Sequence, residues 1–276
     1  MNIFDAHVHV YYQMKLEAII DPMDNLGITW SALLGVDHGL DGDERGTNVN
    51  HKFVADFVAQ APNRLVGFGS IHPDRKVESI PLLEDMILNL GLKGIKIYPH
   101  AGFYPDNPIM MEVYKRLEEL KGVLLVHTGI KALPHQRIIF NRPLPVDEIA
   151  VACPNLQIII CHSGYPWVEE ALWITRLNNN VWLDLTFLET LEIISGEPIT
   201  WDILRKARYM IGCDRIIWGS EGKKLDLEMY PDAGLERMRS SIRRILDAPF
   251  LSEDEKENIL GNNAAKLLEV EDEFFS

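Results

Sequence analysis

The sequence is constrained most by a regular alternation of short apolar runs with segments whose apolar residues recur at helical spacing. Strands that alternate with helices in this way imply a parallel sheet. The run 156–162 is apolar almost throughout, which is typical of a strand buried on both faces of such a sheet. The expected strands cover residues 2–10, 29–35, 65–69, 93–98, 123–127, 156–162, 181–185 and 215–219.

The expected helices cover residues 16–26, 51–60, 81–89, 110–120, 146–152, 167–176, 201–210, 235–246, 253–260 and 264–268. Eight strand–helix units predict that the sheet closes, so the predicted fold class is α/β, a (β/α)8 TIM barrel. Barrels of about 250 residues are ordinary. We therefore expect a single domain over residues 1–276. An open doubly wound sheet is the main rival, but no expected strand is followed by GxGxxG or a P-loop.

Composition restricts the partners of the chain. Forty-one acidic and 27 basic residues give a formal net charge of −14, which argues against binding to nucleic acid or to an anionic membrane surface. A small anionic substrate remains compatible, because local arginines or a metal control the field inside a site. Cys153, Cys161 and Cys213 lie in apolar runs and are expected to be reduced core residues. With no signal-peptide pattern and no apolar run near 18 residues, we expect a soluble, cytoplasmic protein.

The first expected strand carries two histidines two residues apart. In a regular strand, Asp5, His7 and His9 lie on one face, and Phe4, Ala6, Val8 and Val10 lie on the other. His7 and His9 can then converge on one point, and neutral imidazole is the commonest metal ligand in proteins. The alternative for this pair is that both rings pack in the core or face solvent.

Other polar residues occur where the remaining strands end, which is the rim where a barrel forms its active site. They are Lys96, Tyr98 and His100 after strand four, His127 after strand five, His162 after strand six, Asp184 after strand seven and Glu221 after strand eight. His7, His9, His127 and Glu221 can supply up to four N and O ligands to one metal ion. The metal would lower the pKa of a bound water and polarise a substrate oxygen. His162 is then placed as a general acid or base.

Each of these residues has a structural alternative. His127 or His162 could be a hydrogen-bonded core histidine. Asp5 is interpreted as an acceptor that orients one imidazole. The further alternatives are that Lys96 pairs with an acid, that Asp184 braces a loop and that Glu221 caps a helix. The remaining histidines fall in expected loops or helix starts and are predicted to face solvent: His38, His51, His72 and His135.

The rim residues lie in five ordered motifs. They are Phe4-Asp5-Ala6-His7-Val8-His9, Gly91-Leu92-Lys93-Gly94-Ile95-Lys96-Ile97-Tyr98-Pro99, Leu125-Val126-His127-Thr128-Gly129, Cys161-His162-Ser163-Gly164-Tyr165-Pro166-Trp167 and Trp218-Gly219-Ser220-Glu221. These motifs resemble the amidohydrolase-related family, the branch of the amidohydrolase superfamily that includes aminocarboxymuconate semialdehyde decarboxylase and resorcylate-type decarboxylases. The resemblance spans nearly the whole chain, up to Gly261-Asn262-Asn263-Ala264-Ala265.

The resemblance implies a distorted (β/α)8 barrel of the metal-dependent hydrolase type with one divalent metal, usually zinc; manganese is the alternative. The ligands would be His7, His9, His127 and Glu221, and His162 would be the catalytic histidine. The family ordinarily has aspartate where this chain has Glu221, which could therefore ligate, act as the base or miss the metal. Some relatives are lactonases that work without a metal. Lys96 lies near the place of a carboxylated lysine in binuclear members, but this branch does not usually use one.

The first functional hypothesis is a metal-dependent hydrolase in which a metal-activated water, deprotonated by Glu221 or His162, attacks a small amide, ester or lactone. The alternative is a metal-dependent non-oxidative decarboxylase of a small unsaturated or aromatic acid, with His162 delivering the proton. The second alternative is a barrel that only binds a ligand. The residues predicted to contact substrate are Arg45, Lys96, Tyr98, Arg137 and Arg142, the arginines because they pair with carboxylates. Related barrels often dimerise, so a homodimer is a candidate assembly, with Trp167, Trp173 and Trp201 as interface or core residues.

Overall fold

The computed structural model describes residues 1–12, 14–44, 48–131, 134–222 and 234–275. Eight parallel strands pair with one another in chain order. They are β1 (Ile3–His9), β2 (Ile28–Leu34), β3 (Leu65–Ser70), β4 (Gly94–Ile97), β5 (Val123–Val126), β6 (Gln157–Ile160), β7 (Val181–Asp184) and β8 (Ile216–Ile217).

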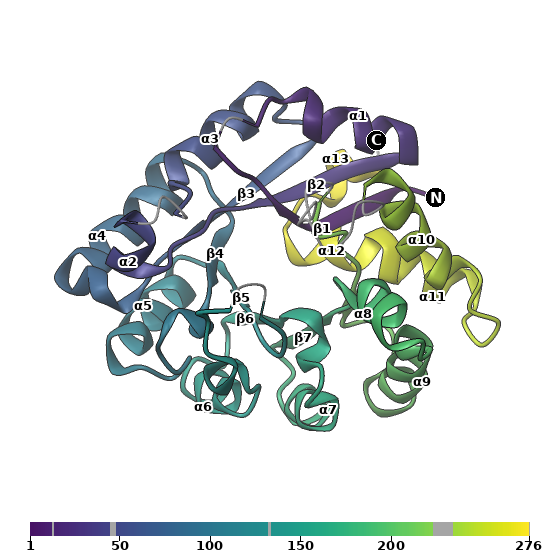
Figure 1. Cartoon of the computed structure of the whole chain (residues 1–276). Coiled ribbons are helices and arrows are strands. Elements are labelled where there is room, and N and C mark those ends of the chain that lie inside the picture. The colour runs from purple at the N-terminus through teal and green to yellow at the C-terminus, as the bar shows by residue number, and fades with distance from the viewer. Residues whose placement is uncertain (13, 45–47, 132–133, 223–233, 276) are drawn as a thin grey trace.

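Backbone hydrogen bonds join the segment after β8 to β1. The Ala6 N–H donates to the Trp218 carbonyl at 3.1 Å, and the Glu221 N–H donates to the His7 carbonyl at 2.8 Å. The sheet therefore closes on itself, with helices around the outside (Figure 1). The predicted (β/α)8 barrel is confirmed.

Most of the helices occupy the predicted positions, and three additional α-helices occur among the described residues. They are α2 (Gly39–Glu44), α8 (Leu188–Ser195) and α13 (Glu271–Phe274). The segment of α8 lacks a regular amphipathic pattern, because Ile193 and Ile194 are exposed while Glu189 and Glu192 face inward, each paired with an arginine. The α-helices are α1 (Glu17–Leu26), α2, α3 (His51–Gln60), α4 (Ser79–Glu84), α5 (Pro108–Glu119), α6 (Pro145–Ala152), α7 (Val168–Leu177), α8, α9 (Ile199–Ile211), α10 (Leu235–Leu246), α11 (Glu253–Glu257), α12 (Asn263–Leu267) and α13 (Glu271–Phe274).

Short 3-10 and π-helical turns fill several of the connections. They are η1 (Pro73–Glu78), η2 (Asp85–Asn89), η3 (Pro99–Ala101), η4 (Ile138–Asn141), η5 (Cys161–Gly164) and η6 (Asn258–Asn262). Of these, η3 and η5 directly follow β4 and β6, so they hold residues at the rim of the barrel.

An irregularity in β1 changes which residues face the interior. We expected Phe4, Ala6, Val8 and Val10 to share one face, and this prediction is wrong. Phe4 and Ala6 belong to the apolar cluster inside the barrel, whereas Val8 and Val10 pack in the layer between strands and helices. The pairing of β1 with β2 shifts register between Asp5 and Val8, which breaks the alternation of faces. As a result, the inward positions beyond Ala6 carry the side chain of His7 and then that of His9.

The C-terminal helices cover the end of the barrel at which the strands begin. Phe274 of α13 packs against Phe4 with ring centroids 6.0 Å apart, and Asn2 donates a hydrogen bond to the Phe274 carbonyl. The two termini consequently lie close together in Figure 1. This leaves the opposite end, where the strands finish, for the polar residues described below.

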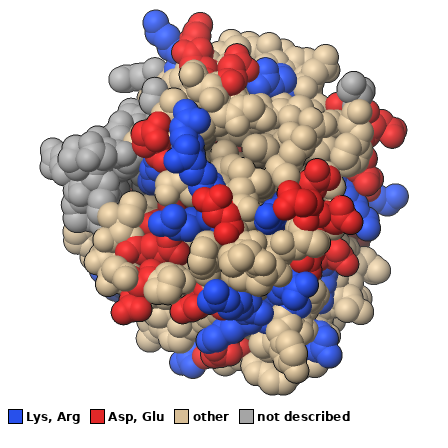
Figure 2. All heavy atoms as spheres, turned by 90° about the vertical axis from the view of Figure 1, so that its right-hand side faces the viewer, with Lys and Arg blue, Asp and Glu red and all other residues tan. Residues whose placement is uncertain are grey.

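The surface carries charges of both signs. On the face shown in Figure 2, acidic and basic side chains are interspersed. Exposed ion pairs of the described residues include Lys206 with Glu169 and Arg208 with Glu255. Within the described part of the chain, no helix combines the length and the apolar character that a membrane crossing requires. All three cysteines are buried and unpaired, as predicted.

Candidate active site

Seven polar side chains from six strand ends come together at the rim of the barrel. All except Glu221 are buried, and the Glu221 side chain is only 11% exposed. The seven are His7, His9, Lys96, His127, His162, Asp184 and Glu221. A group this polar is costly to bury unless its members pair with one another or with a ligand.

The orientation of His7 is fixed by Asp184. The Nδ1 atom of His7 lies 2.5 Å from the Oδ2 atom of Asp184, so Nδ1–H donates to this carboxylate. The lone pair of a neutral His7 is then on Nε2, which points into the group of polar side chains. We had assigned this orienting role to Asp5. Asp5 instead accepts hydrogen bonds from the backbone and hydroxyl of Ser220 and from the backbone of His7.

His127 and His162 are oriented in the same way by backbone carbonyls. His127 donates from Nε2 to the Ile130 carbonyl at 2.7 Å, and His162 donates from Nδ1 to the Thr186 carbonyl at 3.1 Å. In the neutral rings, Nδ1 of His127 and Nε2 of His162 carry the lone pairs, and these two nitrogens are 3.2 Å apart. Two facing lone pairs repel each other, so the arrangement favours a shared proton or a cation beside them.

Glu221 completes the group from the segment after β8. Its Oε2 atom lies 3.2 Å from His7 Nε2, and its Oε1 atom lies 3.3 Å from His9 Nε2. Oε2 is buried without a hydrogen-bond partner among the described residues. His7, His162 and Glu221 each offer one ligand atom, and these three atoms lie within 4.8 Å of one another.

Lys96 points into the same group. Its Nζ atom contacts Nε2 of His7 and lies 3.2 Å from Nε2 of His9. The side chain therefore ends beside both imidazoles of β1. The lysine that we predicted to be a substrate-binding or structural residue lies within the set of candidate ligands.

The donor set fits a divalent metal ion. Nε2 of His7 and Nε2 of His9 lie beside the Glu221 carboxylate, and Nδ1 of His127 faces His162, which lies close enough to this group to exchange a proton with a bound molecule. Imidazole nitrogen and carboxylate oxygen suit zinc and manganese. The second ring nitrogen of His7 donates to a carboxylate and that of His127 to a backbone carbonyl, as is usual for histidines that bind a metal.

The backbone is strained at two of these residues. His162 has φ = 56° and Glu221 has φ = 68°, both in the left-handed region that residues other than glycine rarely adopt. Such strain persists only where surrounding contacts enforce it, and it concentrates at functional sites. One such contact comes from Ser163, whose hydroxyl donates to the Asp184 carbonyl at 2.8 Å.

Arg237 holds the segment that carries Glu221, and the sequence analysis did not identify it. This buried residue of α10 donates to the carbonyls of Ser220 at 2.5 Å and Gly222 at 2.6 Å, and it forms an ion pair with buried Glu189 of α8. Arg237 is one of several arginines in a charged helix, so the sequence pattern gave no signal that this one is buried.

Burial determines the protonation of the catalytic candidate. Burial lowers the pKa of His162 from 6.5 to about 4, although the nearby Glu221 carboxylate opposes this effect. Burial likewise lowers the pKa of His127 well below its ordinary value. Both rings are therefore neutral near pH 7, as ligands and proton acceptors need to be.

Of the other residues predicted to contact substrate, two lie at or next to the site and one lies at the surface. Tyr98 is buried beside His9 and His127, and its hydroxyl donates to the Gly35 carbonyl. Arg137 lines a cavity next to the site. Arg142 pairs with Glu170 of α7 at the surface, so the structure does not bring it to the site. Arg45 lies outside the described residues.

The prediction that four other histidines face solvent holds for His135 alone. His72 is buried, and His51 is only partly exposed. His38 lies with its ring centroid 5.2 Å from that of Tyr98 and 5.4 Å from that of His100, so the segment after β2 covers the site. His72 is buried and His38 is partly buried where α2 and its flanking residues fold onto the rim, whereas His51 is partly buried beside Asp85.

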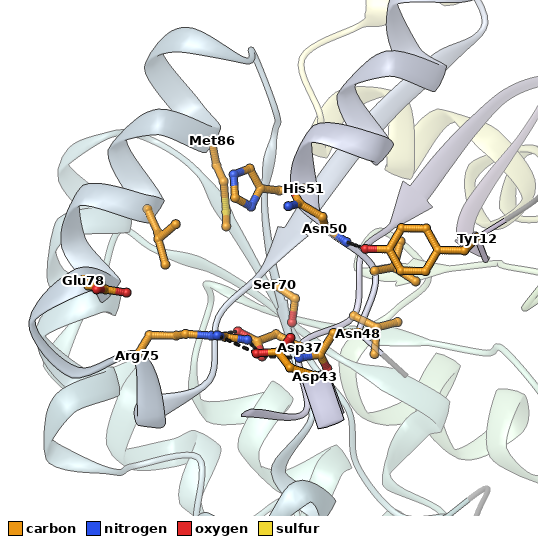
Figure 3. Close-up of a pocket in the computed structure, with 13 residues that line it drawn as sticks. Tyr12, Asp37, Asp43, Asn48, Asn50, His51, Ser70, Arg75, Glu78 and Met86 are labelled. Carbon is orange, nitrogen blue, oxygen red and sulfur yellow. Dashed lines mark hydrogen bonds and ion pairs between the residues drawn. The ribbon is translucent and has the colours of Figure 1, made fainter. Parts of the chain in front are cut away.

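A cavity of about 360 Å³ lies beside this segment and is distinct from the histidine group (Figure 3). Arg75 forms a bidentate contact with Asp37 and a second ion pair with Asp43. Asn48 donates to Asp37, Asp43 and the Gly39 carbonyl. The central charges of this cavity are already paired, so we interpret them as the anchor of the covering segment.

His72, which is buried between β3 and η1, predicts a pH dependence of stability. Burial lowers the pKa of His72 from 6.5, against the attraction of Asp74 and Asp37. The unfolded chain therefore binds a proton that the folded chain does not bind, and the free energy of unfolding should fall as the pH drops below about 6.5. His72→Phe should reduce this slope in urea titrations between pH 6.5 and 5, whereas replacing exposed His135 with Phe should leave it unchanged. Equal slopes in the two variants would contradict the prediction.

Together, the fold and the site define a barrel enzyme with a histidine–carboxylate centre at the carboxyl ends of its strands. The model of the protein family described as amidohydrolase matches residues 4–270 of this chain. The chain therefore belongs to the amidohydrolase family and is an enzyme of the amidohydrolase superfamily.

Two curated relatives match part of the chain. It is 26% identical over 127 residues to 2-amino-3-carboxymuconate-6-semialdehyde decarboxylase of Dictyostelium discoideum, covering 40% of this chain and 35% of that protein. It is 25% identical over 99 residues to Protein fluG of Emericella nidulans, covering 36% of this chain and 11% of that protein. The matched regions thus span about a third or less of either relative.

Solved structures match over nearly the full length and show the fold. An uncharacterised TIM-barrel protein from Bordetella bronchiseptica has a TM-score of 0.78 at 20% identity, covering 100% of both chains. A probable 2-pyrone-4,6-dicarboxylic acid hydrolase from Acinetobacter baumannii has a TM-score of 0.70 at 14% identity, covering 98% and 100%. A dihydroxybenzoic acid decarboxylase from Polaromonas sp. JS666, with bound manganese and 2-nitroresorcinol, has a TM-score of 0.68 at 17% identity, covering 98% of both.

Proposed function

We propose that this enzyme is a metal-dependent non-oxidative decarboxylase, a carbon–carbon lyase of a small unsaturated or aromatic carboxylic acid. The sequence analysis placed hydrolysis first and decarboxylation second. The order is reversed because the relative with the longer curated match is a decarboxylase, and decarboxylases occur among the structural neighbours. A hydrolase among the same neighbours keeps hydrolysis as the second candidate.

The observation that carries the proposal is the position of His162. Its Nδ1–H is engaged by the Thr186 carbonyl, so any proton that the ring exchanges passes through Nε2. That atom faces His127 Nδ1 and belongs to the same group as His7 and Glu221. A substrate held at this group would therefore place its reacting carbon near the only ring nitrogen of His162 that is able to transfer a proton.

The metal would be held by His7, His9, His127 and Glu221. When bound, it supplies positive charge that anchors substrate oxygens and stabilises the negative charge left as carbon dioxide departs. His162 starts as the neutral ring, takes a proton at Nε2 from water or from an acidic group of the substrate, and gives it to the carbon as the carbon–carbon bond breaks. The balanced change is RCOO⁻ + H⁺ → RH + CO₂.

Decarboxylation is tested by measuring carbon dioxide release from a panel of hydroxybenzoates, benzenedicarboxylates and unsaturated diacids, in parallel with hydrolysis of lactones and amides. We expect carbon dioxide from at least one acid and, in D₂O, one deuterium at the carbon that lost it. Turnover of a lactone or amide, with no carbon dioxide from any acid, would replace the proposal with the hydrolase.

Zinc or manganese as the metal, a cytoplasmic location, a single domain over residues 1–276 and a homodimer are part of the same proposal. Trp173 of α7, one of the tryptophans considered for an interface, is 57% exposed.

A further inference from the structure

A cavity of about 400 Å³ opens next to the histidine group and leads to one buried histidine. Its lining comes from the segment after β2, from η3 with Gly102, and from the segment after β5. The side chains that line it are His38, Asp41, His100, His135, Gln136 and Arg137. We refer to this cavity as the His100 pocket.

His100 is the least exposed of these residues and has unused hydrogen-bonding capacity. The residue is only 4% exposed, yet neither Nδ1 nor Nε2 has a hydrogen-bond partner among the described residues. A buried imidazole always has at least one N–H, and leaving that group unpaired is unfavourable. Such an arrangement is expected where a ligand completes the hydrogen bonds.

The ring of His100 connects the pocket to the catalytic group. Its centroid lies 4.4 Å from that of His127, with the rings almost perpendicular, and 5.8 Å from that of Tyr98. His100 therefore borders the pocket on one side and contacts His127 of the histidine group on the other.

Arg137 is fixed beside His100 by the backbone. The Arg137 N–H donates to the His100 carbonyl at 3.0 Å, which joins η4 to η3. The guanidinium of Arg137 forms no ion pair or hydrogen bond with another described residue, whereas Asp41 on the same pocket already takes part in another interaction. Hydrogen-bond donors thus predominate among the groups of the pocket that remain for a ligand.

We propose that His100, together with Arg137, binds a second acidic group of the substrate, so that the enzyme selects dicarboxylates over monocarboxylates. This assignment rests on the proposed function for the first carboxylate, which would lie at the histidine group. An arginine and an imidazole N–H are the donors expected to pair with a carboxylate. His100 thereby becomes a residue that determines substrate specificity.

The experiment compares binding of non-reacting probes by calorimetry. Benzoate is the monocarboxylate, and the dicarboxylates of different span are benzene-1,3-dicarboxylate, benzene-1,4-dicarboxylate and pentanedioate. Wild-type protein should bind at least one dicarboxylate more tightly than benzoate. His100→Phe should weaken the binding of that dicarboxylate about tenfold or more, as expected for loss of one charged hydrogen bond, while benzoate binding changes little.

Additional variants separate recognition from packing. His100→Phe removes no hydrogen bond of the folded chain, so its melting temperature should not fall, and His100→Gln should recover part of the affinity. Arg137→Met, at an exposed position, should also reduce the preference. His51→Phe, which alters the other cavity, is the matched control and should keep the preference.

The inference is overturned if no dicarboxylate binds more tightly than benzoate, or if Arg137→Met and a folded His100 variant keep the wild-type preference. These results are independent of the carbon dioxide assay. A dicarboxylate preference without any carbon dioxide release would contradict the proposed function alone. Carbon dioxide release without such a preference would contradict this inference alone.

Discussion

Replacing His162 with asparagine should lower kcat for carbon dioxide release by about 10² to 10⁴-fold, the usual contribution of a positioned acid–base group. Asparagine tolerates the left-handed backbone at this position, where φ is 56°, and its amide can still donate to the Thr186 carbonyl. The asparagine amide, however, does not transfer a proton near neutral pH. The change therefore removes the chemistry and preserves the local structure.

The measurement is steady-state kinetics on an acid found in the panel, with thermal melting as the test of folding. Tyr209→Asn, at a residue of α9 that is 92% exposed, is the control and should keep the wild-type rate. If folded His162→Asn works within a few-fold of the wild type, His162 is not the proton carrier.

Replacing Arg237 with methionine should destabilise the protein by about 3–5 kcal/mol, because Glu189 would remain as an unpaired buried charge. The carbonyls of Ser220 and Gly222 would lose their donors at the same time. Since these carbonyls flank Glu221, the variant should also bind metal more weakly.

Urea unfolding measures this effect, and a double variant identifies its cause. Arg237→Met combined with Glu189→Gln removes both charges and should recover a substantial part of the lost stability. Lys206→Met breaks the exposed ion pair with Glu169 and should have little effect. An Arg237→Met variant as stable as Lys206→Met would show that the buried pair does not hold this segment.

The sequence was sufficient to predict the barrel and the rim residues. Apolar runs at regular intervals set the eight strands, and parallel strands necessarily end at one rim, so His7, His127 and His162 were expected to meet. The positions of the helices followed from apolar periodicity wherever a helix packs an apolar face on the sheet. This is why α8, which buries Glu189 and Glu192, was not predicted.

Contacts between distant residues could not be read from local patterns. The hydrogen bond from His7 to Asp184 joins residues 177 positions apart, and the ion pair between Arg237 and Glu189 joins α10 to α8. The irregularity in β1 depends on how this strand pairs with its neighbour, so strict alternation gave the wrong face for Val8. His100 was noted at the rim, but its unpaired ring nitrogens are visible only in the structure.

The central claim is that the histidine group at the rim is a divalent-metal centre, and elemental mass spectrometry tests it most directly. The protein is purified without added metal, reconstituted with zinc or manganese, and compared with a His7→Ala/His9→Ala variant. We predict about one metal ion per chain in the wild type and its loss in the folded variant, as expected when two of the proposed ligands are removed. Folded wild-type protein that takes up no metal on reconstitution, or a variant that retains the metal, would contradict the claim.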